Sequence, residues 1–244
     1  MYVDREPRFY ASVHYNGRPV LSAITVDDRN YFSSDKNKDG FGRAEYYYSG
    51  SSGAGTQMTD FTGYNVAKKV STSSSIRNDQ AVYRPYIHIR YAEILLNYME
   101  AMNEYNPEDP KIITYFNEIR ERAGMPQYGT GKDSNGFDKI PLNGQDEVRE
   151  AIYHERRVEL CCENGLRYLD LRRWKKAEEV LNQPMYGMNF SGTKLSDDPN
   201  DAAAFFKRTQ YIKRVYERKF YWYPIYQDQI DKDPTLVQAP FWDK

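Results

Sequence analysis

The fold is decided by residues 146–181, which read DEVREAIYHERRVELCCENGLRYLDLRRWKKAEEVL. The pattern predicts two helices joined at Asn164 and Gly165. At about 100° per residue, Glu155 and Glu159 fall in the middle of an apolar face of the first helix. Buried carboxylates need partners, because an unpaired buried charge is very costly. We expect these partners to come from the same stretch, which offers Arg156, Arg167, Arg172 and Arg173, with Asp170 among them.

Two interpretations of these carboxylates are open. One is a catalytic pair, and the other is a structural lattice of glutamates and arginines that fixes how one helical pair docks on the next. Glycoside hydrolysis uses two carboxylates that face each other across a cleft. Glu155 and Glu159 are instead stacked one turn apart on one helix. Arginine pairs with carboxylates in bidentate geometry, so the sequence favours the structural lattice.

Two more helices are expected upstream. The first spans residues 85–105, opens after Pro85 and has a narrow polar stripe, which is typical of a helix sandwiched between neighbours. The second begins with Asp109 as its N-cap and Pro110 at the first helical position, and ends at Gly124. Because the connection between them is short, we expect these helices to be antiparallel neighbours.

The sequence therefore predicts a mostly α fold of tetratricopeptide-like helix–turn–helix pairs with long loops. A β-hairpin is expected at residues 8–27, with its turn at Asn16 and Gly17. Residues 184–200 are expected to be a loop, residues 211–220 to contain a strand, and the C-terminal segment to run extended over the helices. The chain is thus expected to have three parts. Residues 1–84 contain the hairpin and a long loop, residues 85–182 contain the two helical pairs, and residues 183–244 form the C-terminal region.

Composition excludes several classes of function. The 244 residues carry a formal net charge of -1, which gives no general attraction to nucleic acid. No apolar run approaches the ~18 residues of a membrane span. The adjacent Cys161 and Cys162 are expected to be small core residues rather than a disulfide. The histidines are isolated, and no zinc, nucleotide-binding or hydrolase motif occurs.

Residues 28–82 are expected to form a polar, aromatic loop, and loops of this length are commonly functional. Sugars bind against aromatic faces, while planar polar side chains satisfy their hydroxyl groups. The candidate ligand-binding residues share these chemistries and are Asn30, Tyr31, Phe32, Arg43, Tyr46, Tyr47, Tyr48, Phe61, Tyr64 and Asn65. The three tryptophans are expected to pack within the scaffold, at Trp174, Trp222 and Trp242.

The same loop contains the start of a calcium-binding pattern. Asp35, Asn37 and Asp39 place oxygen ligands at alternate positions before a glycine. The glutamate expected at the twelfth position is missing, since Tyr46 stands there and Glu45 comes one residue early. Calcium is therefore one candidate cofactor, and a solvated acidic turn is the alternative.

Five blocks of the chain resemble, in order, the C-terminal half of the SusD/RagB family of nutrient-binding lipoproteins of Bacteroidota. The blocks are EPRFYASVHYNG (6–17), RPYIHIRYAEILLNYMEAMNE (84–104), YFNEIRERAGMP (115–126), VREAIYHERRVELCCENGLRYLDLRRWK (148–175) and FYWYPIYQDQIDKDPTLVQAPFW (220–242). The last block departs from the family pattern, because QAPFW stands where the family has QNPGW and PIYQ where it has PIPQ.

The resemblance implies a mostly helical fold and a non-catalytic protein exposed at the surface of the outer membrane. It implies a SusC-type TonB-dependent transporter as partner, and an oligosaccharide or polysaccharide as ligand, with peptides bound by some members. It also implies that the binding residues precede the RYAE helix, in the region of the candidates above. The family's N-terminal half and lipid-anchoring cysteine are absent from this sequence. We therefore expect a fragment whose membrane attachment lies in a segment it lacks.

Two alternatives from other classes of function stay open. A glycan-processing enzyme would use carboxylates of the loop, such as Asp60 or Glu45, and turnover of a glycan would reveal it. A helical-repeat scaffold that binds only proteins would have no affinity for small ligands.

Overall fold

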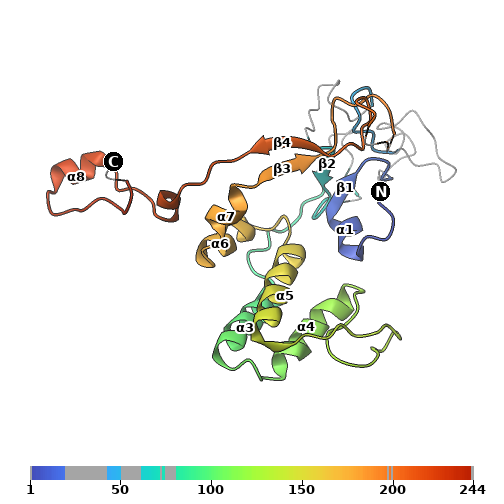
Figure 1. The fold of residues 1–244 in the computed structure, drawn as a ribbon, viewed down its shortest axis with the longest axis horizontal. Coiled ribbons are helices and arrows are strands. Elements are labelled where there is room, and N and C mark those ends of the chain that lie inside the picture. The colour runs from blue at the N-terminus through green and yellow to red at the C-terminus, as the bar shows by residue number, and fades with distance from the viewer. Residues whose placement is uncertain are drawn as a thin grey trace.

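The structure of the chain is a computed structural model that describes residues 2–19, 43–50, 62–71, 73–74, 81–196, 198 and 200–242. Figure 1 shows helices α3, α4 and α5 grouped at one end of the molecule. The strands and α1 lie at another, and the C-terminal segment extends away from both. The described residues are mostly helical outside the loops, which confirms the predicted fold class.

The main core lies between three helices, α3 (Tyr91–Tyr105), α4 (Lys111–Arg122) and α5 (Gly144–Glu159). Helix α3 packs against both of the others. Leu96, Met99, Phe116 and Ile152 are fully buried in this core. Burying each such side chain contributes about 1.5–3 kcal/mol to the stability of the fold. This three-helix core therefore fixes the positions of the segments that pack against it.

The end of α4 follows the predicted signals, but its start lies one residue later than predicted, because Pro110 is the N-cap and Lys111 the first helical residue. The carboxylate of Asp109 accepts a hydrogen bond from the backbone N–H of Lys111 at 2.8 Å, which satisfies one free donor of the first turn. The helix is followed by Gly124 with φ +68, a conformation that glycine adopts at little cost. The prediction for α3 was wrong at its start, because residues 85–90 are not helical and the helix begins at Tyr91. The reason is Arg90, which is extended and binds two glutamates of a distant segment.

The second helix of the organising stretch is divided into α6 (Leu166–Arg173) and α7 (Ala177–Leu181). Lys175 separates them with φ +58, a left-handed conformation that a helix cannot continue through. The predicted turn at Asn164 and Gly165 is confirmed, since both have positive φ. The prediction that both cysteines are core residues was wrong. They follow the end of α5, and Cys162 is exposed with φ +61.

The predicted N-terminal hairpin was wrong in its first strand. Residues of that segment form α1 (Pro7–Ser12) and a short strand β1 (Val13–Tyr15). Pro7 occupies the first helical position, where its missing N–H costs nothing. The turn at Asn16 and Gly17 is present, with Gly17 at φ +83, but β1 pairs antiparallel with the distant β2 (Tyr64–Val66). The second predicted strand lies outside the described residues.

A second two-stranded antiparallel sheet joins β3 (Pro184–Gly187) and β4 (Thr209–Lys213). The predicted loop at residues 184–200 therefore begins with a strand. The predicted strand within residues 211–220 starts two residues earlier and ends at Lys213. The pairing register shifts between Met185 and Tyr186, which marks a β-bulge.

The C-terminal segment contains a 3-10 helix, η1 (Arg218–Tyr221), and α8 (Gln227–Lys232). Phe220 and Tyr221 pack against α6 and α7 in a small cluster. Beyond it the segment extends away from α3–α5 (Figure 1), so the expected course over the helices was wrong. The side-chain amide of Gln238 instead bonds both backbone groups of Ile225, at 2.8 and 2.9 Å, and closes the segment on itself.

Candidate functional site

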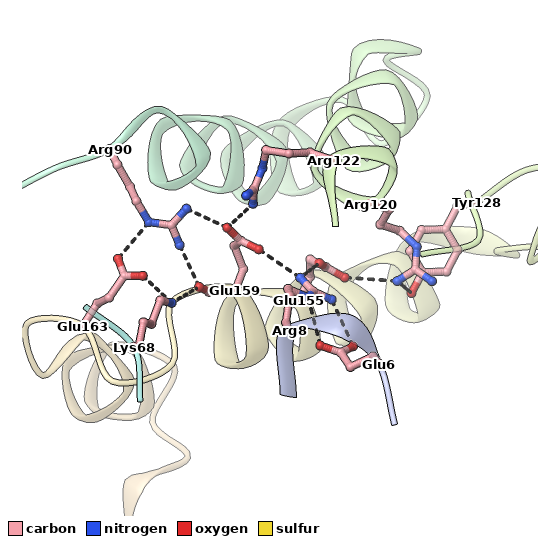
Figure 2. Close-up of polar contacts among 10 residues, drawn as sticks. All are labelled: Glu6, Arg8, Lys68, Arg90, Arg120, Arg122, Tyr128, Glu155, Glu159 and Glu163. Carbon is pink, nitrogen blue, oxygen red and sulfur yellow. Dashed lines mark hydrogen bonds and ion pairs between the residues drawn. The ribbon is translucent and has the colours of Figure 1, made fainter. Parts of the chain in front are cut away.

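The sequence singled out two places for function, the carboxylates of α5 and the aromatic loop. We call Glu155, Glu159 and Glu163 the carboxylate row. The side chains of Glu155 and Glu159 are 0% and 3% exposed, which confirms the predicted burial. Figure 2 shows basic side chains converging on the row from α1, from α4, and from the segments that precede α3 and follow β2.

Glu155 is held between α1 and α4. Arg8 of α1 binds one of its oxygens, and Arg120 of α4 binds the other at 3.1 Å. Arg120 is itself buried, lies over the ring of Tyr128 with 4.3 Å from Cζ to the ring centroid, and donates to the carbonyl of Pro126. Both oxygens of Glu155 therefore have guanidinium partners.

Glu159 and Glu163 share the guanidinium of Arg90. Its nitrogens lie 2.6 Å from a carboxylate oxygen of Glu159 and 2.8 Å from one of Glu163. Arg8 lies 3.1 Å from the other oxygen of Glu159, and Arg122 adds a further contact. Lys68 pairs with Glu163 and also donates to the backbone carbonyl of Glu159 at 2.8 Å. The row thus connects four segments that are far apart in sequence.

The electrostatics of the row are those of a structural lattice. Burial alone would raise the pKa of Glu159, but hydrogen bonds from Arg90 and Arg8 and the charge of Arg122 outweigh it, so the pKa is lowered. The pKa of Glu163 is lowered in the same way, by Arg90 and Lys68 against burial. Both groups stay ionised at neutral pH, and neither Glu155 nor Glu159 reaches solvent. This arrangement supports docking of helices and does not support acid–base catalysis.

The arginines predicted to pair with Glu155 and Glu159 were the wrong ones, although the prediction that arginines pair with them was correct. Arg156 binds Asp170 through two nitrogens at 3.0 Å each, and Arg173 binds Asp170 and Glu100. These pairs tie α6 to α3 and α5. The other two predicted arginines contact aromatic rings: Arg167 lies over Trp174, and Arg172 over Tyr168 and Tyr223.

The tryptophans pack as expected in two of three positions. Trp174 stacks on Tyr153 with 3.8 Å between ring centroids and donates to Glu100 at 2.8 Å. Trp242 donates to the backbone carbonyl of Lys219 at 3.0 Å. Trp222 is partly exposed beside Phe241.

The described aromatic candidates divide into packing residues and one exposed ring. Tyr46 is 5% exposed, and its hydroxyl lies 3.0 Å from Nδ1 of His14 and 3.4 Å from the amide nitrogen of Asn65. Burial and the charge of Arg18 lower the pKa of His14 to about 4, so this imidazole is neutral at pH 7. Tyr46 is therefore a buried packing residue whose hydroxyl contacts the half-buried His14 and the exposed Asn65.

The remaining described candidates lie around these residues. Tyr64 is half-buried in β2 against the ring of Tyr2, and Tyr47 packs beside the small core around Phe205. Arg43 forms an isolated bridge with Pro19. Tyr48 is 49% exposed and is the one described candidate whose ring is largely open to solvent.

Other candidates lie outside the described residues, namely Asn30, Tyr31, Phe32 and Phe61 for ligand binding and Asp35, Asn37 and Asp39 for calcium. Among the described residues, no group of three or more His, Cys, Asp or Glu side chains is arranged so that it could hold a metal ion. In the same part of the chain, none of the helices is long and apolar enough to cross a membrane.

The structure also reveals features that sequence reasoning missed. Residues 81–90 are extended and leave several large side chains exposed, among them Tyr83 and Tyr86. A surface cavity of about 600 Å³ lies between α5, α7 and the sheet of β3 and β4, and three arginines line it. The alternation of basic and apolar residues after Tyr211 was the one sequence signal near this cavity.

Solved structures share this fold. A SusD-like protein from Bacteroides fragilis is 26% identical with a TM-score of 0.65, over 99% of this chain and 39% of that chain. A SusD-like carbohydrate binding protein from the same species is 27% identical with a TM-score of 0.61, over 96% of this chain and 42% of that chain. The fold is therefore that of a helical, SusD-like protein with tetratricopeptide-like pairs.

The sequence comparison gives the family. The model of the SusD family matches residues 1–242, and the chain belongs to this family. A SusD-like protein from Formosa agariphila is 34% identical over 144 residues, which are 58% of this chain and 26% of the relative. A second from the same organism is 39% identical over 101 residues, 39% of this chain and 18% of the relative. The chain spans less than half the length of these two solved structures. The two sequence matches cover less than a third of the length of each curated relative.

Proposed function

We propose that this chain is the ligand-capturing part of a non-catalytic glycan-binding protein at the bacterial cell surface. In this role it delivers oligosaccharides to a SusC-type TonB-dependent transporter in the outer membrane, where a lipid anchor holds the protein. The observation that carries the proposal is the match of the SusD family to residues 1–242. The likeness to a structure described as a SusD-like carbohydrate binding protein supports a sugar as the ligand.

The described geometry supports binding without catalysis. The most prominent carboxylates, Glu155 and Glu159, are saturated by guanidinium groups and closed to solvent. Tyr48 offers an exposed aromatic face, which suits the C–H face of a sugar ring. Its backbone N–H donates to the carbonyl of Gly192 at 2.9 Å, so a second segment anchors the residue. We propose the loop around Tyr48, with the other aromatic and polar candidates predicted from the sequence, as the first place where a glycan binds.

The test is calorimetric titration of the chain with neutral and acidic oligosaccharides and with short peptides, followed by product analysis. We expect saturable binding of at least one oligosaccharide and recovery of that ligand unchanged. Replacing the exposed ring, Tyr48→Ala, should weaken binding about tenfold, as one lost aromatic contact is worth about 1 kcal/mol or more. Tyr105→Ala removes a more exposed ring, 85% against 49% for Tyr48, from the last residue of α3 and is the control for loss of a surface tyrosine.

Three outcomes would contradict the proposal. Release of shorter sugars would make the protein an enzyme. Binding of peptides without any oligosaccharide would change the class of ligand. A folded sample that binds only proteins would favour the scaffold alternative.

A further inference from the structure

The cavity between α5, α7 and the β3–β4 sheet carries the strongest unexplained charge in the described structure. It encloses about 600 Å³, which is within the usual range of ligand sites. Arg157, Arg208 and Arg214 line it, and Glu179 is the one acidic residue of the lining. We call this feature the arginine cavity.

These three arginines have no carboxylate partner among the described residues, unlike the arginines of the carboxylate row. The Nε atom of Arg214 is buried and has no hydrogen-bond partner there. Arg208 lies over the ring of Tyr186, with 3.9 Å from its Cζ to the ring centroid. Three guanidinium groups around one cavity repel one another, and an anion placed between them removes that repulsion.

A second cavity of about 270 Å³ shares Arg157 and Glu179 with the first and adds Arg167, together with Lys176, whose charge is matched by Glu150 at 2.6 Å. Burial and the positive charge of Arg157 both lower the pKa of Arg167, so the excess of positive charge reaches beyond the first cavity.

The wall formed by β3 is suited to a sugar rather than to a bare ion. Successive side chains of a regular strand point to opposite faces, yet Met185 and Tyr186 both line the cavity. The pairing register shifts opposite them, because Met185 pairs with Ile212 and Tyr186 with Gln210, which leaves Tyr211 of β4 as the extra residue of a bulge and bends the sheet at the cavity wall. Tyr186 is 46% exposed and presents an aromatic surface, and Gln183 adds a planar polar group to the lining. Aromatic surface, amide and guanidinium groups together match the apolar face, hydroxyls and negative charge of an acidic sugar.

We propose that the arginine cavity binds the anionic group of an acidic sugar, either a uronate carboxylate or a sulfate ester. This inference rests on the proposed glycan-binding function and names the chemical class of its ligand. Arg208 and Arg214 hold the anion through charge-assisted hydrogen bonds, which are about twice as strong as neutral ones. Tyr186 packs against the sugar ring that carries the anion.

The test compares trigalacturonate with its fully methyl-esterified form, which has the same sugars and no charge. A sulfated neutral trisaccharide forms a separate arm that distinguishes sulfate from carboxylate recognition. Affinity is measured by calorimetry for the wild type, R208Q, R214Q and the double variant. R218Q is the matched control, because Arg218 is an exposed arginine that lies over Phe241 and lines none of these cavities.

We expect esterification to weaken binding at least tenfold, and R208Q and R214Q each to weaken binding of the charged sugar about tenfold. The double variant should lose nearly all preference for charge, and R218Q should stay within about twofold of the wild type. Added salt should weaken the binding of the charged sugar alone.

Equal affinity for both forms, or unchanged affinity in the double variant, would overturn the inference while leaving the proposed function intact. Binding to anionic lipid vesicles in place of either charged saccharide would overturn it as well. Failure of the folded protein to bind any saccharide, neutral or charged, would remove the proposed function and this inference together.

Discussion

Two groups of arginines adjoin α5, and they differ in whether their charge is matched. In the carboxylate row, Arg8, Arg90 and Arg120 each bind a buried glutamate. In the arginine cavity, three arginines line one space and have no carboxylate partner among the described residues. The comparison teaches that matched charge joins segments of the fold, whereas unmatched charge beside a cavity is available to a ligand.

The largest expected effect comes from breaking the matched group. Glu155→Ala leaves Arg8 and Arg120 without a counter-charge in a buried place, and losses of about 3–5 kcal/mol are typical of such changes. Urea unfolding followed by circular dichroism measures the free energy of unfolding. Glu150→Ala on the same helix removes an exposed carboxylate paired with Lys176 and should cost less than about 1 kcal/mol. A loss below about 1 kcal/mol for Glu155→Ala would mean that the row does not hold the helices together.

A second comparison separates burial from charge within the row. Arg120 is buried, while the side chain of Arg122, two residues further on, is 60% exposed. Arg120→Ala should destabilise the protein by about 3 kcal/mol, because it also removes the bond to Pro126 and the contact with Tyr128. Arg122→Ala should cost less than about 1 kcal/mol. Equal losses in thermal unfolding experiments would show that desolvation does not set the strength of these pairs.

A smaller effect is expected in the pH dependence of stability. The pKa values of Glu159 and Glu163 are lowered in the folded protein, so the unfolded chain binds more protons once the pH falls below the ordinary value of 4.5. Their contribution is present above that pH and is lost below it. His14, whose pKa is lowered to about 4 from 6.5, adds a separate loss as the pH falls between these values.

Comparison with Glu159→Gln isolates the carboxylate, because His14 is unchanged in both proteins. The free energy of unfolding of the variant should fall less steeply than that of the wild type below about pH 4.5. Parallel curves for the two proteins would contradict the lowered pKa of Glu159.

The smallest effect on stability is expected in the arginine cavity. R208Q/R214Q removes two charges that have no carboxylate partner among the described residues, so the free energy of unfolding should change by less than about 0.5 kcal/mol or rise slightly. Thermal unfolding at low ionic strength measures it, with R218Q as the control. A marked loss of stability would show that these side chains join segments of the fold and are not held ready for a ligand.

Sequence reasoning succeeded where the information was local. The start of α4 within two residues of Asp109 and its end before Gly124 follow from capping rules that act within a few residues. The burial of Glu155 and Glu159 follows from the helical period alone. The resemblance of five ordered blocks was sufficient to identify the family.

Sequence reasoning failed where contacts between segments distant in the sequence determine the structure. Glu155 binds Arg8, which is 147 residues away, so no local pattern could name the partner. The strand β1 pairs with Tyr64–Val66, a segment far away in the sequence that the fold brings beside it. The arginine cavity combines Arg157 of α5 with two residues around β4, and in the sequence each looks like an ordinary surface arginine.

The central claim is that unmatched charge marks the ligand site, and ligand-induced stabilisation tests it most directly. A ligand that binds the folded state at a hundredfold excess over its Kd adds about 2.7 kcal/mol to the free energy of unfolding. The charged saccharide that binds in the calorimetric titration, trigalacturonate or the sulfated trisaccharide, should therefore raise the Tm of the wild type and of R218Q, and leave that of R208Q/R214Q nearly unchanged. An equal rise in all three proteins, or a rise only with the methyl-esterified sugar, would contradict the account.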